Sequence, residues 1–134
     1  MKKLLTILSL FVFTSVFSQE KTLKFKAIST QLFYKNETSD EWELYQKNGK
    51  TDIDIVLEKN ILTVYAESPA MYKLDGKSVV DLNVKSFNGL SYLAVELKKD
   101  LKCRVDILKH KESEFWILSI FYSDINLRYT LEEN

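Results

Sequence analysis

The chain has 134 residues and a formal net charge of +0, because 19 Lys and Arg residues balance 19 Asp and Glu residues. This length accommodates one globular domain of ordinary size. The balanced charge argues against a polyanion-binding protein, so we expect no nucleic-acid partner. A single Cys excludes an intramolecular disulfide and any metal site built from several cysteines.

The first residues of the chain have the three-part pattern of a secretory signal peptide. A basic start at Lys2-Lys3 is followed by residues 4–17, which are mostly apolar and uncharged. Val16-Phe17-Ser18 then supplies small residues at the −3 and −1 positions of a cut before Gln19. The pattern therefore predicts that residues 1–18 are a signal peptide.

We expect residues 19–134 to fold as a single β-domain after export to the periplasm or outside the cell. A buried amino-terminal helix is the alternative for the leader, but the abrupt change to Glu20-Lys21 and then to alternating polarity disfavours it. A membrane-spanning helix needs about 20 apolar residues, which the leader does not supply. We therefore expect no membrane span in the mature chain.

The mature sequence alternates between apolar and polar residues, which is the period of a β-strand with one dry face. The clearest case is residues 101–107, where every odd position is apolar and every even position is charged. The same alternation recurs in residues 52–57, 80–85 and 125–131. Its phase flips around Ala27-Ile28, which predicts a β-bulge or a sharp bend there.

The connections between these strands are expected to be short turns. Each of the three glycines follows Asn or Asp, at Asn48-Gly49, Asp75-Gly76 and Asn88-Gly89. Such dipeptides favour the two-residue type I′ turn, so we expect each to close a β-hairpin. Strands joined in this way are antiparallel neighbours.

Together these features predict an all-β fold, an antiparallel meander of about eight to ten strands. A meander must protect its edge strands from pairing with other chains. Closure into an up-and-down or half-open β-barrel, lipocalin-like in architecture, is therefore favoured. A β-sandwich is the alternative.

No group of residues predicts catalysis. The only histidine, His110, is expected on a solvated turn, whereas a hydrolytic triad needs a base, a nucleophile and an acid in contact. Cys103 lies on an apolar face and is expected to fill core. The carboxylate pairs Glu41/Glu43 and Asp52/Asp54 could hold a cation or transfer protons, but solvated strand faces explain them better. We expect no catalytic residue, no metal and no cofactor.

Residues 115–122 are unusual because both faces of this predicted strand are apolar. The even positions are expected to point into the core. The odd positions place Phe115, Ile117 and Phe121 on the outer face, where exposed apolar groups would form a contact surface. That surface would suit a homodimer or an envelope protein partner. Coverage by another segment of the chain is the alternative.

Aromatic residues, Tyr72 among them, are frequent in the chain, and a barrel interior lined by them can hold a small apolar or sugar ligand. The candidates for a cavity lining are Trp42, Tyr65, Trp116 and Tyr122. The alternative is that these side chains simply fill the barrel.

Several segments carry a resemblance to known proteins. They are the Lys-Lys leader ending at Ser18-Gln19, Trp42-Glu43, Ile61-Leu62-Thr63-Val64-Tyr65, Leu101-Lys102-Cys103-Arg104-Val105 and Tyr122-Ser123-Asp124. With them the chain resembles small exported proteins of unknown function that are common in Bacteroidetes such as flavobacteria. The resemblance implies an envelope or secreted location, and it assigns no activity and no functional residue.

The sequence thus favours an exported, non-catalytic β-barrel binding module for an apolar small ligand or a protein partner. A structural or interaction protein of the cell envelope that self-associates is the first alternative. A hydrolytic enzyme is the second.

Overall fold

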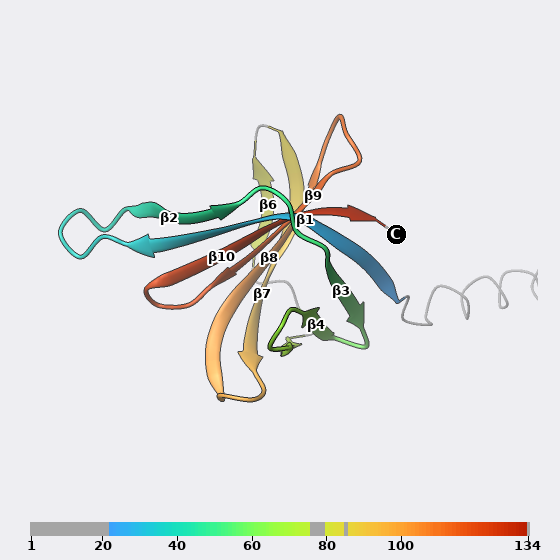
Figure 1. Ribbon diagram of the computed structural model, residues 1–134, viewed down its shortest axis with the longest axis horizontal. Coiled ribbons are helices and arrows are strands. Elements are labelled where there is room, and N and C mark those ends of the chain that lie inside the picture. The colour runs from blue at the N-terminus through green and yellow to red at the C-terminus, as the bar shows by residue number, and fades with distance from the viewer. Residues whose placement is uncertain (1–21, 76–79, 85, 134) are drawn as a thin grey trace, which may run out of the picture.

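The computed structural model describes residues 22–75, 80–84 and 86–133, and their regular structure is entirely β-strand (Figure 1). The predicted signal peptide lies outside these residues. Within them, no helix is long and apolar enough to cross a membrane. The strands are β1 (Leu23–Lys35), β2 (Trp42–Asn48), β3 (Ile53–Glu58), β4 (Ile61–Tyr65), β5 (Ala70–Leu74), β6 (Val80–Val84), β7 (Phe87–Glu96), β8 (Leu101–His110), β9 (Trp116–Phe121) and β10 (Ile125–Glu133).

Eight of the described strands form a closed antiparallel barrel. Neighbouring strands pair in the order β1, β3, β4, β5, β7, β8, β9 and β10, and β10 pairs with β1 to close the ring. Strand β2 pairs with the second half of β1, and β6 pairs with the first half of β7. Figure 1 shows the β1–β2 ribbon reaching out to one side. The barrel, rather than the sandwich, is therefore confirmed.

The predicted bulge in β1 is also confirmed. The register of β1 against β10 shifts between Ala27 and Ser29, which leaves Ile28 as the extra residue. At this point β1 changes its other neighbour from β3 to β2. Thr51, in the link between those two strands, fixes the change by donating its hydroxyl to the Ala27 carbonyl oxygen at 2.7 Å.

The Asn-Gly pairs do not form the predicted hairpin turns, and this prediction is wrong for both described glycines. Gly49 joins β2 to β3, which both pair with β1, and Gly89 lies inside β7. Neither has a positive φ. The positive φ values of a type I′ turn occur instead at Lys59 (51°) and Asn60 (64°), between β3 and β4. Gly76 lies outside the described residues.

The inward positions of the strands fill the barrel with apolar side chains, as the alternation predicts. Cys103 and Val105 of β8 point inward and are buried, while Leu101 at the start of the strand is half-exposed. At one end of the barrel the rings of Phe25 and Trp116 pack with their centroids 5.3 Å apart. Burial of one face of a strand is what fixes its register in such a sheet.

Candidate functional site

The other end of the barrel contains a cavity of about 600 Å³. This volume lies in the range of roughly 300–1,000 Å³ that is typical of small-molecule sites. The cavity lies between the carboxyl ends of β1 and β4, the first part of β10, and the connections β4–β5, β7–β8 and β9–β10. Its walls are mainly apolar and include Leu32, Val64, Ala66, Ala70, Ile125 and Leu127.

Three polar side chains meet in the lining of this cavity. The Tyr122 hydroxyl donates to Oε2 of Glu96 at 3.3 Å, and the hydroxyls of Tyr72 and Tyr122 lie 2.8 Å apart. Because the Tyr122 proton is directed to Glu96, the Tyr72 hydroxyl is the donor to Tyr122. The result is a chain of hydrogen bonds from Tyr72 through Tyr122 to a carboxylate that is only 5% exposed. We call these three residues the polar floor.

The strand register explains why these residues converge. Tyr72 of β5 is the direct cross-strand partner of Glu96, the last residue of β7, so both side chains lie on the inner face. Tyr122 follows β9 and continues the inward phase of Ile120. Its backbone N–H donates to the Ile125 carbonyl oxygen at 2.8 Å, which holds the residue at the start of the turn to β10.

Burial keeps the groups around the polar floor protonated. It raises the pKa of the Tyr72 and Tyr122 phenols, that of Tyr129 to about 12 and that of the Cys103 thiol to about 11. The nearby Glu96 carboxylate adds to the shift at Cys103. At neutral pH these groups are therefore hydrogen-bonding groups and not nucleophiles.

The rim of the cavity carries positive charge. Lys98, Lys99 and Lys102 lie on or beside the β7–β8 connection, with Asp124 on the β9–β10 connection. All four residues are exposed. Among the described ion pairs, none involves Glu96, so the rim lysines do not neutralise the floor.

The structure does not bring the four predicted cavity residues together. Tyr122 lines the cavity, but Trp116 lies inside the opposite end of the barrel. Tyr65 is 54% exposed because Val64 occupies the inward position of β4. Trp42 lies on β2, outside the ring, and its ring centroid is 5.8 Å from that of Phe121.

The predicted contact surface is partly covered by the chain itself. Phe121 is half-buried between Trp42 of β2 and the guanidinium of Arg104, whose Cζ lies 4.2 Å from the ring centroid. Ile117 is also half-buried, whereas Phe115 is 44% exposed. Of the three predicted residues, Phe115 is thus the exposed one.

His110 ends β8 and does not lie on the predicted turn. Its ring centroid is 5.0 Å from that of Phe87, and its Nδ1 accepts the Glu112 backbone N–H at 3.2 Å. His110 belongs to the strand because β8 remains paired with β7 up to this residue, whose partner is Phe87. The polar residues around His110 predicted a turn there.

The predicted carboxylate pairs are on the surface. Asp52 and Asp54 both face the Lys26 ammonium, at 2.9 Å and 4.0 Å. Glu41 and Glu43 are exposed beside and within the start of β2, near the outer end of the β1–β2 ribbon. Among the described residues, no group of three or more His, Cys, Asp and Glu side chains could hold a metal ion.

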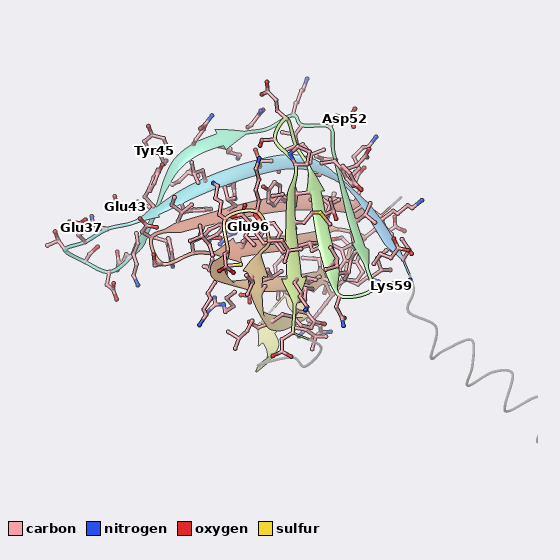
Figure 2. The ribbon with its side chains drawn as sticks, turned by 90° about the horizontal axis from the view of Figure 1, so that it is seen from below. Glu37, Glu43, Tyr45, Asp52, Lys59 and Glu96 are labelled. Carbon is pink, nitrogen blue, oxygen red and sulfur yellow. The ribbon has the colours of Figure 1, made fainter. Side chains whose placement is uncertain are left out.

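Sequence reasoning missed Glu96, and it counted Tyr72 among the aromatic residues without selecting it as a cavity residue. Figure 2 shows Glu96 among the barrel strands, whereas Glu37 and Glu43 lie on the projecting ribbon and Lys59 lies at the β3–β4 turn. Glu96 lies two residues after Ala94, so both side chains point to the same face of β7. This spacing predicts that Glu96 is buried only if the inner face of β7 is already known.

Comparison with known proteins adds no assignment: no family model, no curated protein and no solved structure matches the chain. The cavity and its polar floor are consequently the basis for the function proposed below.

Proposed function

We propose that the protein is an exported, non-catalytic binding module that holds a small, largely apolar molecule in the cavity of its barrel. The observation that carries the proposal is a cavity of about 600 Å³ with apolar walls and a few polar groups gathered at its floor. Such a combination is typical of small-molecule sites, where apolar contacts supply affinity and a few polar groups supply orientation.

The placement of reactive side chains favours binding over hydrolysis. His110 lies at the far end of β8 from the cavity, roughly 30 Å from Leu101 at about 3.3 Å per residue. A base at that distance cannot act on a group held at the polar floor. The protonated state of Tyr72, Tyr122 and Cys103 supports the same conclusion.

Export is proposed from the leader alone. The basic start at Lys2-Lys3 and the apolar run of residues 4–17 are typical of a cleavable signal peptide. In an aqueous periplasmic or extracellular compartment, an apolar cavity would shield much of a poorly soluble molecule from water.

Filling the cavity is expected to abolish binding. The neutral fluorescent probe N-phenyl-1-naphthylamine should bind the purified mature chain at one site and gain fluorescence. Ala66→Phe places a ring in the cavity wall and should weaken binding at least tenfold. The matched control Ser39→Phe adds the same ring at an exposed position of the β1–β2 connection and should leave binding unchanged. Absence of probe binding, or equal binding by both variants, would overturn the proposed function.

A further inference from the structure

The carboxylate of Glu96 is buried and forms no ion pair with the part of the chain that the structure describes. The residue is 5% exposed, it lines the cavity, and its Oε2 accepts a hydrogen bond from the neutral phenol of Tyr122. At 3.3 Å this bond is long for a hydroxyl donating to a carboxylate, for which about 2.5–2.7 Å is usual. Among the described ion pairs, none includes Glu96.

A second buried carboxylate in the same barrel is satisfied differently. Asp106 is also 5% exposed, but it accepts the Ser91 hydroxyl at 2.6 Å and faces the Arg104 guanidinium at 3.2 Å. A buried carboxylate ordinarily needs such a cation and short hydrogen bonds, because its removal from water is costly. Among the described residues, Asp106 has both a short hydrogen bond and a cation, whereas Glu96, which lines a cavity, has one long hydrogen bond and no ion pair.

We propose that the cavity binds amphipathic amines, with the protonated amine against Glu96 and the apolar body along the cavity walls. This inference rests on the proposed function, since it names the class of ligand for that same cavity. A primary ammonium has three donors and no acceptor. The polar floor matches it: Glu96 offers its carboxylate, and the Tyr72 oxygen accepts because its own proton is directed to Tyr122.

The lysines of the rim do not favour an amphipathic acid, whose charged group would lie at the rim and not at the polar floor. An amphipathic acid would place its carboxylate near Lys98, Lys99 and Lys102, which are exposed to solvent, and attraction there is weakened by water and salt. Its apolar end would then lie against Glu96 and bring no cation to that carboxylate. The buried charge therefore decides in favour of an amine at the floor.

This inference is tested at neutral pH by measuring how well three ligands displace N-phenyl-1-naphthylamine. The ligands are octylamine, 1-octanol and octanoate, which have the same chain length and differ in their polar group. Octylamine is expected to displace the probe at concentrations at least tenfold lower than 1-octanol or octanoate. Glu96→Gln, which keeps the shape of the side chain and removes its charge, should lower the ratio of octylamine affinity to 1-octanol affinity at least tenfold. The control Glu43→Gln changes an exposed carboxylate on β2 and should alter neither affinity.

A second variant protects the test against misfolding of Glu96→Gln. Tyr72→Phe removes the accepting oxygen without changing charge and should weaken octylamine severalfold more than 1-octanol. If the probe binds but octylamine shows no advantage, or if octanoate binds best, the amine proposal is overturned and the binding function stands. If the probe does not bind at all, the binding function itself fails, and the amine proposal fails with it.

Discussion

Replacing Leu118 by Ala is expected to lower the free energy of unfolding by about 3 kcal/mol, within the ~2–5 kcal/mol usual for such changes in packed cores. Leu118 is 1% exposed and belongs to β9, which is hydrogen-bonded to β8 on one side and β10 on the other. Because both neighbouring strands are fixed in a closed ring, the walls cannot collapse freely into the space that the leucine leaves. Denaturant unfolding with an unchanged slope would measure this loss.

Leu93 provides the matched control for this substitution. Leu93 lies at an outward position of β7, and its side chain is 55% exposed. Leu93→Ala therefore removes the same atoms from the surface that Leu118→Ala removes from the core. Leu93→Ala is expected to change the free energy of unfolding by no more than about 0.5 kcal/mol. Equal losses for Leu118→Ala and Leu93→Ala would contradict the assignment of inner and outer faces.

Gly89→Ala is expected to lower the free energy of unfolding by about 2 kcal/mol, within the ~1–3 kcal/mol typical of overpacking. A Cβ at Gly89 would overlap the carbonyl oxygen of Ile107 and lie 2.9 Å from the Cα of Leu108. Both are backbone atoms of the neighbouring strand β8, so relief requires moving that strand and not only a side chain. Thermal and denaturant unfolding of the purified variant would measure the loss.

Gly49 allows the same substitution without the overlap. Nothing lies within 4 Å of a Cβ built there, and its φ is not in the left-handed region. Gly49→Ala should therefore be neutral or stabilise by up to about 1 kcal/mol, because it restricts the unfolded chain. A Gly89→Ala protein as stable as the Gly49→Ala protein would show that β7 and β8 are not as close as described.

The fold was largely predictable because the apolar period of two records which face of each strand is buried. In β8 the alternation of residues 101–107 gave the inner face correctly, and the flip of phase near Ile28 gave the bulge. Shifting a strand by one residue would expose its entire apolar face, so the pattern strongly constrains the register.

The turns were not predictable from dipeptides alone. Asn48-Gly49 has the composition of a type I′ hairpin, yet it joins two strands that pair with different halves of β1. A glycine is needed at position 89 because the backbone of β8 lies close to it. This contact between strands cannot be predicted from the residues next to Gly89. Long-range pairing overrode the local preference at both positions.

The candidate site was predictable only in part. Alternation placed Tyr122 on the inner face, but its partners Tyr72 and Glu96 are 50 and 26 residues away in the chain. Residues 90–97 are apolar on both faces, so the sequence does not indicate whether Glu96 points inward. The polar floor forms only when the barrel closes and brings β5, β7 and the end of β9 around one cavity.

The pairing of β1 with β10 is the contact that closes the barrel, and nuclear magnetic resonance can test it directly. Backbone NOEs are expected between strand residues paired across this junction, such as Leu32 with Leu127 and Phe25 with Glu133, with the register shifting at Ile28. Observation of these contacts would establish the ring that encloses the cavity. NOEs from β1 to β2 and β3 only, with fast-exchanging edge amides along β10, would contradict the closed barrel and the binding site built upon it.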